Sequence, residues 1–401
     1  MNKKYEAVIL SAVRTPIARF QGALKGIDAP KLGAIAIKAA VERAGIPNLA
    51  EIDEVFMGNV VPAGVGQAPA RQASIFAGLP STVGATTVNK VCGSGLKAIM
   101  FGVQGIKAGD GQLYVGGGME SMTRAPFLVG GRTGELRYGH ATMKDSLLHD
   151  GLWDPFEDWA MGNAADFIAD EYGVTREEMD AFSAESQQNA ISAIEAGKFK
   201  AEIIPVEIPG RKGKVTIFDT DEGPRAGTTA EGLGKLRPVF NKEGKSTAGN
   251  SSTLNDGAAA VVVSSREYAE RNGIKPLARV VAYGHAAVEP KYLFAAPAKA
   301  MPKILKKAGW TFADVDLIEL NEAFSAQCLA NGKELAEQGW DWDKVNVNGG
   351  GIALGHPIGM SGARVIATLI YALKDRGLKR GLTALCLGGG EAVAMAIELE
   401  D

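Results

Sequence analysis

Apolar and polar positions along this chain follow two periods, one typical of buried strands and the other of helices with one apolar face. In the first third, the pattern predicts strands at Ala7–Val13, at Glu54–Val60 and over "LYVGGG", and helices at Ala29–Ala44, near Gln67–Ala77 and after Cys92. The last third repeats this order, with strands at Ala278–Tyr283, at Asp316–Leu320, over "TALCLGGG" and over "AVAMAIELE", and helices at Pro297–Ala308, at Glu322–Glu337 and near Met360. Strands that alternate with helices predict an α/β fold with buried, largely parallel sheets.

Two pairs of similar segments indicate a duplication within the chain. "CGSGLKAI" resembles "GMSGARVI", and "YVGGGMES" resembles "CLGGGEAV". The first pair begins two helices with small residues, which allow the helices to pack closely at the centre of the fold. We therefore predict two similar halves that face each other, residues 1–121 together with 254–275 and residues 276–401.

Residues 122–253 differ in composition from both halves. They contain "GGRTGELRYGH", the tryptophans Trp153 and Trp159, the charged helix "TREEMDAFSAESQQNAISAIEAG" and the turn "RKGKVTIFDTDEGPR". The paired pattern of strand and helix is missing here, and "AGNSSTLNDGAAAVVVSS" then returns to an apolar strand. We predict that residues 122–253 form an inserted lid or loop domain.

Composition and charge favour small-molecule chemistry. The 401 residues include 43 basic and 46 acidic side chains, for a net charge of -3 without a block of like charge, so neither nucleic acid nor a membrane surface is a predicted partner. The apolar run near the N-terminus is interrupted by Glu6 and is too short for a spanning helix. Three cysteines, an odd number far apart, do not form a disulfide framework and predict a reducing, cytoplasmic location.

Two of the cysteines lie close to glycines, which the chain concentrates in short clusters where backbone must approach something closely. Cys92 lies in "NKVCGSGLKA" at a strand-to-helix turn, and the start of a helix favours a thiolate. Cys386 precedes three glycines at the carboxyl end of a strand, where α/β proteins bind ligands. For each cysteine, the alternative is a small apolar side chain that packs in the core.

One histidine and one asparagine have comparable settings. His356 is held between a glycine cluster and Pro357, which favours a functional role over that of an ordinary loop histidine. Asn321, in "LNEAF" at a strand end, is suited either to cap a helix or to hold a water or donate to an oxyanion. Cys328, within "AFSAQCLANG", is predicted to be packing.

Together these stretches resemble the thiolase family, the acyl-CoA C-acyltransferases that make or cleave 3-ketoacyl-CoA. The resemblance spans nearly the whole chain and rests on six motifs in order: "NKVCGSGLKA", "GGGMESMTRAPF", "STAGNSSTLNDGAA", "LNEAFSAQ", "NVNGGGIALGHPIGMSGAR" and "CLGGGEA". It implies a thiolase-like α/β fold, in which two duplicated halves form a layered α/β/α/β/α core with an inserted lid domain.

The resemblance also implies roles for five residues. Cys92 is the nucleophile that takes the acyl group, so that the reaction proceeds by two ping-pong half-reactions. His356 accepts the Cys92 proton, and Cys386 exchanges the α-proton of the acetyl unit. Asn321 holds a water that stabilises an enolate together with His356. The backbone N–H groups of Cys92 and Gly388 form the oxyanion site.

CoA thioesters are the substrates that the resemblance implies, with no separate cofactor and no metal. Residues expected to contact the CoA or the acyl group are Ser252, Arg225, Ala160, Met161, Leu293 and Phe324. Two of these depart from the pattern of members specialised for acetoacetyl-CoA, namely Ala160 in "DWAMG" and Leu293 in "EPKYLFAAP". We therefore predict tolerance of a longer or branched acyl chain.

Three alternatives remain at this point. A decarboxylating ketoacyl synthase is disfavoured because such enzymes have no second catalytic cysteine corresponding to Cys386. A thiolase-like binding subunit of a larger complex is disfavoured by the intact set of cysteines, histidine and asparagine. A zinc or redox site is poorly supported, because the sequence has no C-x-x-C motif. The resemblance further implies a homodimer or homotetramer, with "FLVGGRTGELRYGH" as one possible contact.

Overall fold

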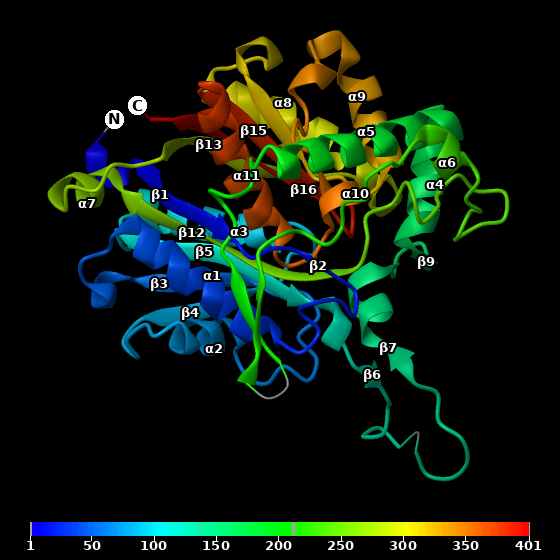
Figure 1. Ribbon diagram of the computed structural model, residues 1–401, viewed down its shortest axis with the longest axis horizontal. Coiled ribbons are helices and arrows are strands. Elements are labelled where there is room, and N and C mark those ends of the chain that lie inside the picture. Colours follow the sequence, from blue (N-terminus) through cyan, green and yellow to red (C-terminus); the bar gives the residue numbers. More distant parts are fainter. Residues whose placement is uncertain (1, 135, 211–212, 401) are drawn as a thin grey trace.

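The repeated pattern of strands and helices folds into two halves with matching elements (Figure 1). The computed structural model describes residues 2–134, 136–210 and 213–400. The first half contains β1 (Ala7–Arg14), α1 (Ala29–Ala44), β3 (Glu54–Gly58), α2 (Pro69–Phe76), β4 (Gly84–Val88), α3 (Ser94–Ala108), β5 (Leu113–Ser121) and β12 (Asn255–Ser265). The second half contains β13 (Ala278–Ala287), α8 (Ala296–Ala308), β14 (Leu317–Leu320), α9 (Ser325–Leu335), α10 (Gly351–Leu354), α11 (Ser361–Arg376), β15 (Arg380–Leu387) and β16 (Glu391–Leu399).

The strands of both halves join into one sheet with a repeated order. Across the described residues the order is β14-β15-β16-β13-β1-β12-β5-β3-β4, with β2 (Ala18–Arg19) paired to β12. Read outward from the middle, β1-β12-β5-β3 in the first half corresponds to β13-β16-β15-β14 in the second. The halves meet where β1 pairs with β13 over only two residue pairs, Val8 with Arg279 and Ile9 with Ala278. This short joint allows the two half-sheets to diverge around the helices between them.

The prediction of largely parallel sheets is wrong. Parallel pairs are β3–β4, β3–β5 and β14–β15, and the remaining pairs of the main sheet are antiparallel. In the second half, β15 and β16 are joined by a tight turn over residues 388–390, which forces them to run antiparallel. In the first half the corresponding strands, β5 and β12, also run antiparallel, but residues 122–254 connect them in place of a turn.

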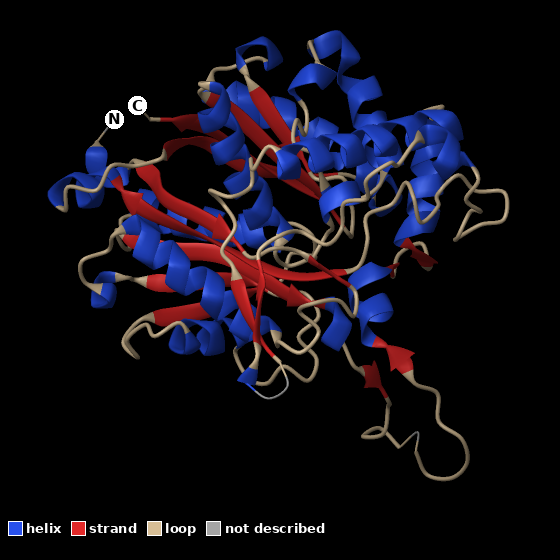
Figure 2. Cartoon of the chain, viewed as in Figure 1, coloured by secondary structure: helices blue, strands red, loops and turns tan. Residues whose placement is uncertain are grey.

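Helices lie on both faces of each half-sheet, which gives the layered α/β/α/β/α core (Figure 2). α1 and α2 cover the outer face of the first half-sheet, and α8 covers that of the second. α3 and α11 cross between the half-sheets, as the small residues predict. A Cβ atom on Gly362 would lie 2.2 Å from the backbone nitrogen of Leu96, and one on Gly95 would lie 2.8 Å from that of Ala363. These helices therefore pack backbone against backbone.

The segment between β5 and β12 contributes a separate group of elements. They are β6 (Phe127–Leu128), β7 (Lys144–Asp145), a π-helix (Leu147–Leu152), β8 (Trp153–Asp154), β9 (Trp159–Ala160), α4 (Met161–Glu171), α5 (Arg176–Glu195), β10 (Val206–Pro209), β11 (Val215–Phe218) and α6 (Ala230–Gly234). The charged helix α5 begins with a capping box between Thr175 and Glu178 and packs on α9 and α10 of the second half. The proposed boundaries at 122 and 253 remain a prediction.

Across the described ranges, the structure contains no helix that is both long and apolar enough to span a bilayer. The longest helix, α5, has both charged and polar residues along its length.

Candidate active site

Cys92 lies in a strained turn between β4 and α3. The preceding residue, Val91, has φ = 46°, a left-handed conformation that is unusual for a β-branched side chain. The turn is closed by Ser94, whose hydroxyl accepts the N–H of Lys90 at 2.8 Å and donates to the carbonyl of Val91 at 2.6 Å. A conformation of this kind costs about 1–3 kcal/mol and persists where the surroundings enforce it. Here it directs the Cys92 side chain into a cavity.

The resting Cys92 thiol is protonated. Burial raises its pKa to about 12, although the backbone N–H groups of Cys92 and Gly388, which are directed at the sulfur, lower it in part. The expectation that the start of α3 would favour a thiolate is therefore wrong for the resting protein, because desolvation outweighs the helix terminus. The same two N–H groups, on Cys92 and on the predicted residue Gly388, are placed to bind an oxyanion formed next to the sulfur.

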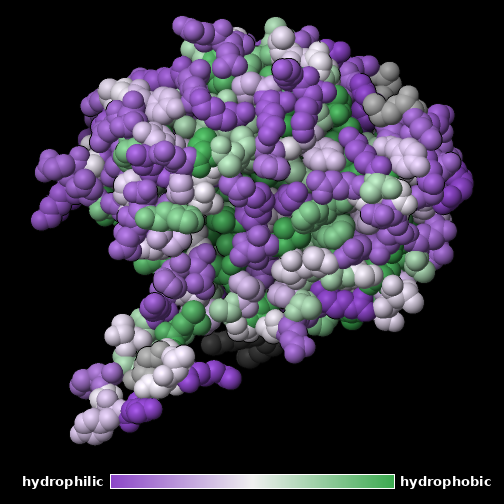
Figure 3. Space-filling model, turned by 180° about the vertical axis from the view of Figure 1, so that it is seen from behind, coloured by the Kyte–Doolittle hydropathy of each residue, from purple (hydrophilic) through white to green (hydrophobic). Residues whose placement is uncertain are grey.

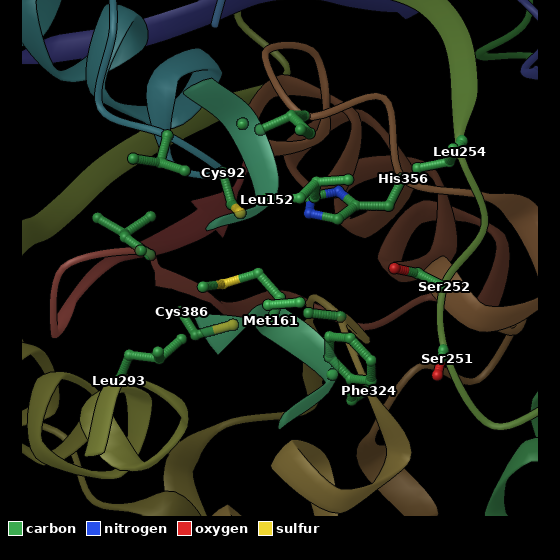
Figure 4. Close-up of a pocket in the computed structure, with 18 of the residues that line it drawn as sticks. Cys92, Leu152, Met161, Ser251, Ser252, Leu254, Leu293, Phe324, His356 and Cys386 are labelled. Carbon is green, nitrogen blue, oxygen red and sulfur yellow. The ribbon is translucent and has the colours of Figure 1, made fainter. Parts of the chain in front are cut away.

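His356 faces the cavity from the loop between α10 and α11 (Figure 4). Its Nδ1 lies 2.6 Å from the hydroxyl of Ser361, and this hydroxyl donates to the carbonyl of Pro357 at 2.9 Å. The hydroxyl therefore accepts from Nδ1–H, which leaves Nε2 unprotonated, with the side-chain NH₂ of Asn321 3.5 Å away as a donor to it. Burial, and next the positive charge of Arg364, lower the pKa of His356 to about 3. A neutral imidazole with an unprotonated Nε2 is equipped to accept a proton.

Asn321 lies beside His356 and does not cap a helix. Its Nδ2 is 3.5 Å from His356 Nε2, and its backbone N–H continues the β14–β15 ladder by donating to Ala384. The following helix, α9, begins only at Ser325, so the capping alternative is wrong. The Asn321 side chain is fully buried and its Oδ1 has no hydrogen-bond partner among the described residues. A buried, unpaired oxygen of this kind fits a bound water or substrate.

Cys386 faces the same cavity from near the end of β15, as the sequence predicts for a ligand-binding edge. The residue is 1% exposed, and burial, with the neighbouring Cys92 as the next cause, raises its pKa well above the ordinary value for a thiol. It is therefore a protonated acid at rest. Cys328 lies on the buried face of α9, in the core of the second half, and packs there as predicted.

The cavity itself is narrow and mostly apolar, with a volume of about 140 Å³. Both halves and the insertion contribute to its wall. Five of the six residues predicted to contact the substrate line it: Ser252, Ala160, Met161, Leu293 and Phe324. Figure 4 shows the Ser252 hydroxyl directed towards the cavity, with Met161 beside Cys386. The sixth, Arg225, is exposed and lies outside this wall, so its role remains a prediction.

Sequence reasoning missed several residues of this site. Ser361, which orients His356, was read only as part of a helix start. Further apolar wall residues that sequence reasoning missed include Val91, Met122, Leu148, Leu152, Phe240, Leu254 and Ile358. Those from the insertion have no repeating pattern that marks them as neighbours of the cysteines. Within the described residues, no group of three or more histidine, cysteine or acidic side chains is placed to hold a metal ion.

Known proteins share this architecture along the whole chain. The profile described as "Thiolase, N-terminal domain" matches residues 7–267, and "Thiolase, C-terminal domain" matches residues 274–399. A crystal structure of the Bacillus anthracis acetyl-CoA acetyltransferase aligns with a TM-score of 0.95 and 42% identity over 100% of both chains. Fold and site thus define a two-domain α/β protein with the thiolase fold. The chain belongs to the thiolase family, which confirms the resemblance seen in its motifs.

Curated relatives match along their full length. A Pseudomonas aeruginosa protein named acetyl-CoA acetyltransferase is 53% identical over 393 residues, which cover 98% of this chain and 99% of the relative. An Escherichia coli protein named probable acetyl-CoA acetyltransferase is 48% identical over 397 residues, which cover 99% of this chain and 100% of the relative.

Proposed function

We propose that this protein is an acyl-CoA C-acyltransferase that condenses acetyl-CoA with an acyl-CoA and, in reverse, cleaves 3-ketoacyl-CoA with CoA. The observation that carries the proposal is the meeting of Cys92, His356 and Cys386 in one apolar cavity, with two backbone N–H groups directed at the Cys92 sulfur. Full-length relatives named acetyl-CoA acetyltransferase support acetyl-CoA as a substrate.

In the cleavage direction, the first half-reaction begins with proton transfer from Cys92 to Nε2 of His356. The thiolate attacks the keto carbon of the substrate, and the N–H groups of Cys92 and Gly388 stabilise the oxyanion that forms, each by about 3–4 kcal/mol. The carbon–carbon bond then breaks and leaves an acyl group on Cys92. The imidazolium of His356 and the water held by Asn321 each donate a hydrogen bond to the enolate oxygen of the departing acetyl-CoA, and His356 keeps its proton. Cys386 gives its proton to the enolate carbon.

The second half-reaction restores the starting state. CoA gives its thiol proton to the Cys386 thiolate and attacks the acyl group on Cys92. Cys92 leaves as a thiolate and regains its proton from His356, so that protons and electron pairs balance over the cycle. Condensation is the same sequence in reverse. The raised pKa of Cys386 suits an acid that must be protonated when cleavage begins.

The test is a pair of assays on the purified protein. We expect CoA-dependent loss of acetoacetyl-CoA, and formation of acetoacetyl-CoA from acetyl-CoA alone. The matched control offers acetyl-CoA with malonyl-CoA and measures release of carbon dioxide. Carbon dioxide release, without cleavage of acetoacetyl-CoA, would contradict the proposal and favour a decarboxylating ketoacyl synthase.

The acyl group is proposed to lie against the apolar wall near Ala160 and Leu293. Ala160 has the smallest side chain that still has a Cβ atom, and it lies where β9 meets α4 at the cavity. Leu293 and the neighbouring Phe294 supply apolar contacts from the second half. This wall offers a longer or branched acyl chain apolar surface instead of hydrogen-bond donors. Arg225 is proposed to meet the phosphate end of CoA.

The molecule is proposed to assemble as a homodimer or homotetramer in the cytoplasm. Residues 129–134 and 136–143, between β6 and β7, belong to an arm that projects from the body (Figures 1 and 3). Apolar side chains at and near this arm are exposed, including Phe127, Leu136, Tyr138 and Met143, and Tyr138 is fully exposed. Another copy of the chain would bury them. Light scattering on the protein with and without residues 130–142 would show whether the arm sets the oligomeric state.

A further inference from the structure

The loop that carries His356 enters the first half of the molecule. At its tip, the carbonyl oxygen of Gly359 lies where three glycines of the first half leave room. A Cβ atom on Gly118 would lie 1.9 Å from this oxygen, one on Gly58 would lie 2.7 Å away, and one on Gly95 would lie 3.0 Å away. Any side chain at these positions would push the loop back. The position of His356 therefore depends on contacts with the half that carries Cys92.

Glu120 holds this tip from the end of β5. Its Oε2 accepts the N–H groups of Gly359 and Val60, each at 2.9 Å. Its Oε1 accepts the side-chain N–H of Asn59 at 2.6 Å and the N–H of Val61 at 3.3 Å. One carboxylate thus ties the His356 loop to the end of β3. All of these partners are donors, so the arrangement requires the ionised carboxylate.

This carboxylate is costly to keep. Glu120 is fully buried, and no lysine, arginine or histidine of the described residues forms an ion pair with it. Burial raises its pKa to about 7 in spite of its four donors. An apolar residue would avoid this desolvation cost but would leave the N–H groups of Gly359 and Val60 without an acceptor.

We propose that Glu120 is a positioning residue that sets the distance between His356 and Cys92 through its bond to Gly359. The proposal rests on the role proposed above for His356. A second hydrogen bond also holds the loop to the first half, because the side-chain oxygen of Asn255 in β12 accepts the backbone N–H of His356 at 3.0 Å. The imidazole is thereby fixed to the first half on both sides of Pro357. A misplacement of 1 Å at a reacting group costs on the order of 100-fold in rate.

The test compares Glu120→Gln with a matched control, Asp316→Asn, in single-turnover acylation by acetyl-CoA. In E120Q, an NH₂ group replaces one acceptor oxygen. This group faces N–H donors and cannot accept hydrogen bonds from them. Asp316 also accepts two backbone N–H groups, those of Lys379 and Arg380, but at the amino end of β14, away from the cavity. We expect E120Q to acylate on the order of 100-fold more slowly at saturating acetyl-CoA. The acetyl-CoA concentration that gives half the maximal rate should change little. D316N should lose thermal stability but acylate at the parent rate.

A double-mutant cycle with His356→Ala separates positioning from general destabilisation. Because Glu120 acts through His356, E120Q should add little to the loss already caused by H356A. The proposal is overturned if the two losses multiply, or if E120Q acylates as fast as D316N. Parent-like acylation by H356A would instead refute the proposed role of His356, whatever E120Q does.

A milder variant covers the case in which E120Q does not fold. Asn59→Ala removes only one of the four donors to Glu120. We expect N59A to acylate more slowly than the parent, by a smaller factor than E120Q. In the H356A background, N59A should cause no further loss. A loss of the same size with and without His356 would refute positioning through the histidine loop.

Discussion

Substitution of His356 by alanine tests the proton transfer on which the first half-reaction depends. Burial raises the pKa of the Cys92 thiol to about 12 and lowers that of His356 to about 3, which favours a protonated thiol and a neutral imidazole at rest. Neither group changes protonation state near neutral pH. Acylation of the parent protein is therefore expected to be nearly independent of pH across the neutral range.

The size of the expected loss follows from the thiol. At pH 7, a thiol with a pKa of about 12 is a thiolate in about one molecule in 10⁵, and forming this thiolate from solvent costs about 7 kcal/mol. A positioned general base contributes typically 10²- to 10⁴-fold. We expect H356A to acylate slower by about this factor. Its rate should rise about tenfold per pH unit, because the thiolate must now form by equilibrium with solvent.

The assay is rapid-quench acylation by acetyl-CoA, followed by mass spectrometry, over a range of pH. The control is His285→Ala, since His285 is exposed on β13 outside the cavity. A flat pH profile in H356A, or acylation within a few-fold of the parent, would refute the idea that His356 takes the Cys92 proton.

Three other outcomes are expected. Cys386→Ala should still be acylated at Cys92 but should lose cleavage of 3-ketoacyl-CoA and exchange of the acetyl α-proton; cleavage at the parent rate would exclude Cys386 as the acid. A profile of kcat/KM for acetoacetyl-CoA and its longer and branched homologues should fall only gradually, and a steep optimum at acetoacetyl-CoA would contradict the proposed acyl wall. Arg14 donates to Glu202 at 2.5 Å and to Asp221 at 2.7 and 2.9 Å, all fully buried. Arg14→Leu should therefore lower the free energy of unfolding by about 3–5 kcal/mol in urea titrations, and a loss below about 1 kcal/mol would show that this ion cluster is dispensable.

The elements of the fold could be read from the sequence because they depend on local patterns. α1 has the predicted bounds, Ala29–Ala44, and β1 extends the predicted strand by one residue, to Arg14. Strand direction could not be read in this way, because it depends on the connection between paired strands. A turn joins β15 to β16 whereas a long insertion joins β5 to β12, and both pairs are antiparallel.

The site was predicted where a residue type and its setting carry the chemistry by themselves. Cys92, Cys386 and His356 stand out because each is a rare residue type in the chain and lies within two residues of a glycine. Glu120 was missed because its importance lies in hydrogen bonds to distant backbone, such as the bond across 239 residues from Gly359. Ser361 was missed because its contact with His356 depends on how the intervening loop folds. No pattern in one sequence reveals such a pair.

The most direct test of the central claim is to find where the acyl group is held. The protein is incubated with acetyl-CoA, quenched in acid, digested and mapped by mass spectrometry. The account predicts an acetyl group on the peptide that contains Cys92, which disappears when CoA is added before the quench. An unmodified Cys92, or an acetyl group on Cys386 or Cys328 instead, would contradict it.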